Sequence, residues 1–113
     1  MFNTKLEGDK GEALAYNFLK KKGYKIIETN YNCHSGEIDI IAIDKDTYVF
    51  VEVKNRSSLR FGLPQEAINQ SKIHHIKRSA ENYLKYHRLL GQVRVRFDCI
   101  TILFEENGGS QID

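Results

Sequence analysis

The chain has 113 residues, of which 41% are hydrophobic and 28% are charged, and its formal net charge is +2. This length suits one compact domain and is too short for two, and the composition is typical of a globular protein. No apolar run approaches the length of a membrane span, so we expect no membrane partner. Residues 1–10 are polar and charged and show no signal peptide.

The two cysteines, Cys33 and Cys99, lie far apart in the sequence. Without a secretory signal they are expected to be free thiols in a reducing compartment, which predicts a cytoplasmic protein. His34 follows Cys33, but a zinc site needs more ligands at defined spacing, so we expect no zinc.

Positive charge is concentrated in one segment. Residues 71–96 hold seven Lys or Arg residues and one Glu, a net charge of +6, whereas the rest of the chain holds ten against fourteen, a net charge of −4. A basic segment beside acidic residues fits a site that binds a metal ion and phosphates. A helix with a solvated charged face explains the same charges without a ligand. The residues that we assign to nucleic-acid contact are Arg56, Lys72, Lys77, Arg78, Arg94 and Arg96.

The first expected helix covers residues 4–22. Thr4 and Glu7 match a capping box at its start, and apolar residues then recur at helical spacing. Glu12 lies at the border of this apolar stripe. It is read either as a surface glutamate or as a carboxylate that reaches the sheet beneath the helix.

Three strands are expected next, over residues 24–30, 37–44 and 47–54, with a loop over 31–36 between the first two. The fold class is therefore α/β.

A second helix, opened by Pro64, is expected over residues 65–89, and one long strand, or two with a break, over 92–104. The polar segment 105–113 is expected to be a frayed tail of the single domain 1–113. The order α-β-β-β-α-β(β) predicts a mixed sheet flanked by helices. The expected packed face of the second helix holds Ile73, Ile76, Ala80, Tyr83, Leu84 and His87.

The two central strands carry acidic residues among Ile, Val and Phe, where an unpaired buried carboxylate is costly. If residues 45–46 form a two-residue loop, Asp39 lies directly opposite Glu52. Glu37 then lies opposite Lys54 on the same face. Opposed residues have Cβ atoms about 5 Å apart, which allows two carboxylates to chelate one ion. A surface salt-bridged by Lys54 explains the same residues without a metal.

This arrangement predicts phosphodiester hydrolysis with Mg²⁺ or Mn²⁺ as the cofactor. Asp39, Glu52 and the Val53 carbonyl are the predicted ligands, because Mg²⁺ takes oxygen ligands and keeps several waters. Lys54 is predicted to orient the attacking water or to hold the phosphate. Glu12 is predicted to accept a hydrogen bond from a water of the site or to bind a second ion.

Asp39, followed after twelve residues by Glu-Val-Lys at 52–54, resembles the PD-(D/E)xK nuclease signature, although Ile38 stands where the signature has proline. The runs Gly-Glu-Ile-Asp-Ile-Ile at 36–41 and Phe-Val-Glu-Val-Lys at 50–54, with Gly-Glu and Phe-Asp pairs in the first helix and last strand, resemble the YraN-like family of bacterial proteins. This resemblance covers nearly the whole chain.

The YraN-like family is similar to archaeal Holliday-junction resolvases. The resemblance implies a restriction-endonuclease-like fold, with catalytic roles for Glu12, Asp39, Glu52 and Lys54. It also implies a nucleic-acid substrate, expected to be DNA, structure-selective cleavage and a homodimer. The alternative is a nucleic-acid-binding module that keeps this fold without catalysis.

Overall fold

The computed structural model describes the backbone of residues 4–57, 70–104 and 110–112, with side chains over residues 10–55 and 70–102. The elements in chain order are α1 (Thr4–Lys21), β1 (Lys25–Cys33), β2 (Gly36–Asp44), β3 (Thr47–Ser57), α2 (Gln70–Tyr86), β4 (Arg94–Phe104) and β5 (Ser110–Ile112). The strands form one sheet in the order β1-β2-β3-β4-β5. The pair β3–β4 is parallel and the other three pairs are antiparallel. The predicted mixed α/β fold is confirmed.

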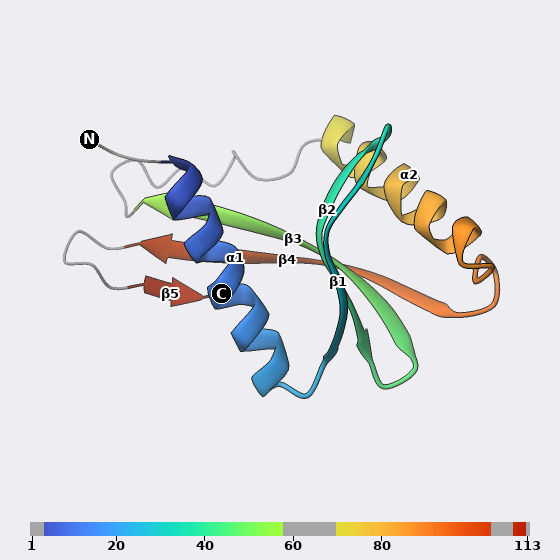
Figure 1. Ribbon diagram of the computed structural model, residues 1–113, viewed down its shortest axis with the longest axis horizontal. Coiled ribbons are helices and arrows are strands. Elements are labelled where there is room, and N and C mark those ends of the chain that lie inside the picture. The colour runs from blue at the N-terminus through green and yellow to red at the C-terminus, as the bar shows by residue number, and fades with distance from the viewer. Residues whose placement is uncertain (1–3, 58–69, 105–109, 113) are drawn as a thin grey trace.

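The two helices cover opposite faces of this sheet. On one face α1 packs against β1, β3 and β4, with Ala15 and Leu19 buried against Val49 and Val51. On the other face α2 packs against β1 and β2, with Tyr83 and Leu84 buried against Ile38, Ile41 and Phe50. Figure 1 shows α1 crossing β3 and β4, whereas α2 lies near the far end of the β1–β2 hairpin. No helix in the described part of the chain is long and apolar enough to cross a membrane.

The turn between β2 and β3 has the predicted two residues, Lys45 and Asp46. Lys45 has a φ of 60°, as the tight turn requires, and the pairs run from Asp44↔Thr47 to Ile40↔Val51 in the predicted register. The ladder then ends, although both strands continue. The predicted ladder pairs of Asp39 with Glu52 and of Glu37 with Lys54 are therefore wrong.

The ladder ends because the β1–β2 hairpin bends away from β3. Asn30 has a φ of 52°, and the β1–β2 register runs from Thr29↔Ile40 to Tyr31↔Ile38 around it, so the bend lies opposite Asp39. Beyond this point β2 stays paired with β1, and β3 stays paired with β4 through Ser57. Figure 1 shows β1 and β2 rising together toward α2 while β3 and β4 run on in another direction.

The bent hairpin is held by α2. The Tyr31 ring meets the Tyr83 ring edge to face at 5.3 Å between centroids, and the Tyr31 hydroxyl donates to Asn82 Oδ1 at 2.8 Å. Gly36, at a φ of 143°, brings the tip of the hairpin against Ser79 of α2. Aromatic packing and a close backbone approach together fix the separation of β2 from β3.

Two expectations for the irregular segments are wrong. The predicted loop over residues 31–36 is strand except at His34 and Ser35, because pairing with β2 overrides the loop preference of its polar residues. The predicted frayed tail contains β5, which pairs with the end of β4. A short polar strand of this kind carries no alternating pattern that a sequence can display.

The second helix also differs from its expected form. It ends at Tyr86, and Arg88 beyond it has a φ of 58°, which a helix does not allow. Of its expected packed face, Ala80, Tyr83 and Leu84 are buried, whereas Ile73 is 41% exposed. The predicted helical start over 65–69 lies outside the described residues. The loop expected over 55–63 is strand as far as Ser57, where β3 ends, and the rest of it lies outside the described residues.

Replacing Tyr83 tests the contact between the hairpin and α2. Tyr83 is 6% exposed, whereas Tyr86, three residues along the same helix, is 80% exposed. We expect Tyr83→Ala to lower the free energy of unfolding by about 3–5 kcal/mol, because it empties a packed site. Tyr86→Ala should change it by less than about 0.5 kcal/mol. Urea unfolding measures both, and equal losses would contradict the packing described above.

Candidate metal and phosphate site

Asp39 lies where the sheet divides. Its carboxylate oxygen Oδ2 accepts a hydrogen bond from the backbone N–H of Val53 at 2.7 Å. Because β2 has left the ladder at Ile40, a side chain takes the place of the backbone acceptor that a continued ladder would supply. A hydrogen bond to a carboxylate is stronger than one between neutral groups, so Asp39 is held firmly against β3.

The same geometry gives the Val53 carbonyl its direction. A residue in a strand presents its N–H and its C=O to the same neighbour. The Val53 N–H meets Asp39, so the Val53 carbonyl also points to the side that β2 has vacated. This places the Val53 carbonyl oxygen on the same side of β3 as the Asp39 carboxylate, as the predicted ligand role of Val53 requires.

Glu52 is the second carboxylate of the site, and two lysines accompany it. Glu52 is 9% exposed, and its Oε2 forms an ion pair with Lys72 Nζ of α2 at 2.5 Å. Burial lowers the pKa of Lys54, and contact with the Lys72 amine lowers it further. Burial also acts to lower the pKa of Lys72, but its hydrogen bonds to Glu52 and Lys54, together with the charges of Glu52 and Asp39, outweigh burial and raise it. One buried acid thus shares the charge of two amines.

Asp39 is short of positive charge. Burial raises the pKa of its carboxyl to about 7, and the nearby charges of Glu52, Glu12 and Glu37 raise it as well. The hydrogen bond from Val53 acts in the opposite direction and does not compensate. Near neutral pH the site therefore gains from any cation that approaches Asp39.

Glu12 reaches the site from the other face of the sheet. It is half-buried on α1, and its charge contributes to the raised pKa of Asp39. The position of Glu12 therefore fits the prediction of a carboxylate that reaches the sheet better than the prediction of a surface glutamate. Gly11 beside it has no side chain, which allows Asn55 of β3 to lie against the helix.

The carboxylates of Asp39 and Glu52 line a polar pocket of about 420 Å³ between the β1–β2 hairpin, β3 and α2. Its walls include Asp39, Glu52 and Lys72, together with Glu37 on the rim. Ser71 and His75 of α2 also line it. A phosphate group and several waters fit in this volume beside the acids.

The other basic residues assigned from the sequence lie in different places. Lys77 and Arg78 are exposed on α2. The Arg96 guanidinium is on the α1 face, where it binds Asp98, Asp44 and the Tyr24 hydroxyl. Arg94 lies beside Thr47, five residues along β3 from Glu52, or about 16 Å at the rise of a strand. The Arg56 side chain lies outside the described part.

Sequence reasoning placed Lys72 among phosphate contacts and did not foresee its ion pair with Glu52. His75, for which the sequence suggests a surface position or a phosphate contact, and Ser71, for which it suggests no role, also line the pocket. No local pattern marks these three residues, because their positions depend on how α2 docks against β3. The +6 charge of residues 71–96 was the only sequence signal that this segment serves the site.

The donor set suits a small, hard cation. Within the described residues no group of three or more His, Cys, Asp or Glu side chains is placed to hold a metal ion. The candidate ligands are therefore the two carboxylates of Asp39 and Glu52 and the backbone carbonyl of Val53. Mg²⁺ is commonly bound by one or two carboxylates, with waters and substrate phosphates completing its shell. The residues therefore fit Mg²⁺ or Mn²⁺ better than zinc, which prefers a closed set of nitrogen and sulfur ligands.

The residues of this site lie in the part of the chain that is similar to known proteins. A model of the uncharacterised protein family UPF0102 matches residues 11–102. A UPF0102 protein of Caldicellulosiruptor bescii is 50% identical over 103 residues, which cover 91% of this chain and 87% of that protein. Another, from Acetivibrio thermocellus, is 46% identical over 107 residues, covering 94% and 82%. A third, from Clostridium perfringens, is 48% identical over 94 residues, covering 83% and 76%.

The raised pKa of Asp39 makes a prediction about stability and pH. The folded protein holds this proton more tightly than the unfolded chain, in which the pKa is near 4. Metal-free protein should therefore lose stability as the pH rises from about 4 to about 7. We expect a loss of about 1–3 kcal/mol, since part of the carboxyl remains in water.

Asp39→Asn should remove this loss, because the amide oxygen can still accept from Val53 and carries no charge. Asp46→Asn is the matched control, since that side chain is 73% exposed at the β2–β3 turn. Urea unfolding in the presence of a chelator, measured from pH 4 to pH 8, gives the comparison. If the stability of the parent and of Asp39→Asn changed equally with pH, the pKa of Asp39 would not be raised in the folded protein.

Proposed function

The chain belongs to the uncharacterised protein family UPF0102, and because that description names no activity we propose a function from the site itself. The protein is a divalent-metal-dependent nuclease that hydrolyses phosphodiester bonds, with DNA as its substrate. The observation that carries this proposal is the pair Asp39 and Glu52 on the two diverging strands, beside Lys54 and Lys72.

The acids are assigned to cation binding. Asp39 is oriented by Val53 N–H, and Glu52 is buried at the floor of the polar pocket. A bound Mg²⁺ or Mn²⁺ would neutralise charge on the phosphate and lower the pKa of a water. Such a pair is a poor design for phosphate binding alone, because carboxylates repel phosphates. This favours hydrolysis over the alternative of a non-catalytic binding module.

The lysines are assigned to the phosphate and the attacking water. Hydrolysis adds the water oxygen to phosphorus and breaks the bond to the leaving oxygen, so the water loses one proton and the leaving oxygen gains one. Lys54 has a lowered pKa and lies next to Glu52, which suits a group that holds this water. Lys72 forms an ion pair with Glu52. Its amine becomes available to a phosphate oxygen once another cation neutralises that carboxylate. The charge of Glu12 on α1 raises the pKa of Asp39 and adds to the negative charge that would attract a cation.

Resemblance adds to this proposal. The order of Glu12, Asp39, Glu52 and Lys54 resembles that of PD-(D/E)xK nucleases of the restriction-endonuclease-like fold. The mixed sheet with helices on both faces is compatible with it. The similarity to Holliday-junction resolvases favours structured DNA and a homodimer. Two free cysteines, Cys33 and Cys99, and a DNA substrate suit the cytoplasm.

Cleavage assays test the proposal. Purified protein with Mg²⁺ or Mn²⁺ should cut linear, flapped or four-way DNA. Asp39→Asn should reduce the rate roughly 100-fold or more, because it removes charge that stabilises the transition state. Asp46→Asn should cut like the parent. Absence of cutting on every substrate, or equal cutting by Asp39→Asn, would contradict the proposal. Salt-dependent binding without cutting would instead support the binding module.

Lys72 gives a separate prediction for the cation. Its amine and an incoming ion compete for Glu52, so Lys72→Met should raise Mn²⁺ affinity by about 3- to 10-fold, which corresponds to the loss of a partly exposed ion pair. Lys77→Met, one and a half turns along α2, should leave the affinity unchanged. Isothermal titration calorimetry measures both. A lower affinity in Lys72→Met would exclude competition at Glu52.

A further inference from the structure

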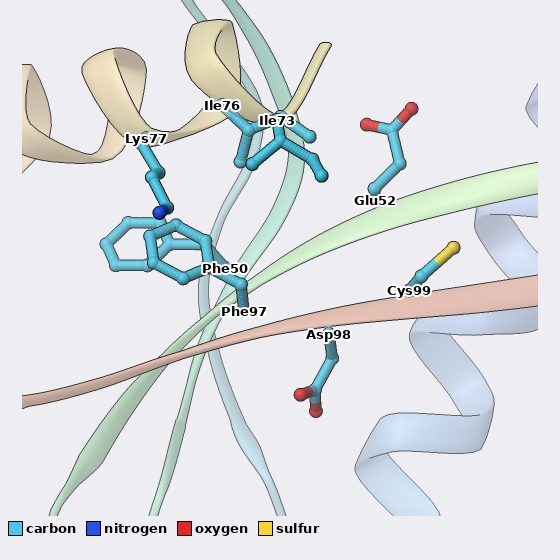
Figure 2. A pocket seen from close by; sticks show the side chains of 8 residues that line it. All are labelled: Phe50, Glu52, Ile73, Ile76, Lys77, Phe97, Asp98 and Cys99. Carbon is cyan, nitrogen blue, oxygen red and sulfur yellow. The ribbon is translucent and has the colours of Figure 1, made fainter. Parts of the chain in front are cut away.

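A second pocket adjoins the polar one. It has a volume of about 220 Å³ and lies between α2 and β4. Figure 2 shows Ile73 and Ile76 projecting from α2 over the gap, with the Phe50 and Phe97 rings and Lys77 at one end and Glu52 at the other. Glu52 and Ile76 line both pockets, so the two share a wall.

The walls of this pocket are mainly apolar and one of them is an aromatic face. Phe50 is buried, and its ring lies 5.7 Å from that of Phe97 with 30° between the planes. Phe97 remains 43% exposed and Ile73 41% exposed. Asp98 points away from the gap, into the other face of the sheet. A flat apolar surface next to the polar site is therefore open to a ligand.

We propose that this pocket holds an unpaired nucleobase next to the phosphate that is cleaved. The inference rests on the proposed nuclease function and specifies its substrate class. The base would lie against Phe97 and Ile73, and its neighbouring phosphate would face Glu52, Lys54 and Lys72 through the shared wall. Lys77 at the opposite end would meet the next phosphate, which matches the positive charge of this helix.

The size and chemistry of the pocket favour a base over other occupants. Pockets for drug-sized ligands are commonly 300–1,000 Å³, and about 220 Å³ suits one flat ring system. Stacking on an aromatic side chain accepts any base, because every base has a π-face. A base within a duplex is stacked on both sides and cannot enter unless it is extruded. The pocket therefore selects DNA with an unpaired nucleotide, such as a flap or a junction, without reading its sequence.

Two readouts test the base pocket without cleavage, in the presence of a chelator. The chain has no tryptophan, so Phe97→Trp places a single tryptophan in the pocket, and a stacked base should quench its fluorescence. Tyr86→Trp, at an 80% exposed position, is the control. In the parent protein, Cys99 of the pocket should be protected from alkylation by single-stranded or flapped DNA, with Cys33 as the internal reference.

Affinity measurements complete the test. Phe97→Ala should weaken binding of a single-stranded oligonucleotide roughly 5- to 100-fold, the range for loss of one stacked base, and leave binding of the fully paired duplex unchanged. Phe97→Trp should retain affinity, and Val95→Ala, on the same strand but outside the pocket, should have no effect.

Three results would overturn the base pocket: equal quenching and protection by fully paired DNA, no effect of Phe97→Ala, or a change in oligomeric state of Phe97→Ala without DNA. The last would mean that a second copy of the chain fills the pocket. Base binding without any metal-dependent cutting would reject the nuclease and retain the pocket. Cutting of fully paired DNA without protection of Cys99 would reject the pocket and retain the nuclease.

Discussion

The hydrogen bond from Val53 N–H to Asp39 stands at the point where β2 leaves β3. Ending an antiparallel ladder inside a sheet leaves backbone groups without partners, and burying them unpaired is costly. Asp39 accepts one of these groups and is oriented by it. The bend at Asn30, the packing of Tyr31 on Tyr83 and the close approach of Gly36 to Ser79 hold the hairpin away from β3. The pocket lined by Asp39 and Glu52 depends on that separation.

This arrangement concentrates negative charge in a partly buried site, where burial disfavours the charged form of Asp39. The pKa of Asp39 is raised to about 7 by burial and by its acidic neighbours, and Lys72 crosses from α2 to neutralise Glu52. Buried charges that are only partly compensated are typical of functional sites rather than of stabilising networks. In the proposed nuclease, the same deficit of positive charge drives cation binding, and the amine of Lys72 then serves the phosphate.

The sequence predicted the local geometry well and the long-range geometry poorly. The two-residue turn at Lys45 and Asp46 and its register were accessible, because turn length and strand alternation fix which residues oppose one another. The departure of Asp39 from that register was not accessible, because it arises from the left-handed Asn30 and from docking on α2. The partnership of Lys72 with Glu52 and the exposure of Phe97 depend on the same docking and leave no local pattern. The strand β5 was not predicted, because a strand of three mainly polar residues resembles a tail.

The central claim is that Asp39, Glu52 and the Val53 carbonyl bind one divalent cation. Paramagnetic Mn²⁺, titrated into ¹⁵N-labelled protein, broadens the amide signals nearest to it and so locates the ion directly. We expect the signals of Asp39, Val53 and Lys54 to disappear at the lowest Mn²⁺ concentrations, those around the turn at Asp46 to persist, and Mg²⁺ to compete. Broadening centred on Asp46, or spread evenly over the acidic surface, would contradict it.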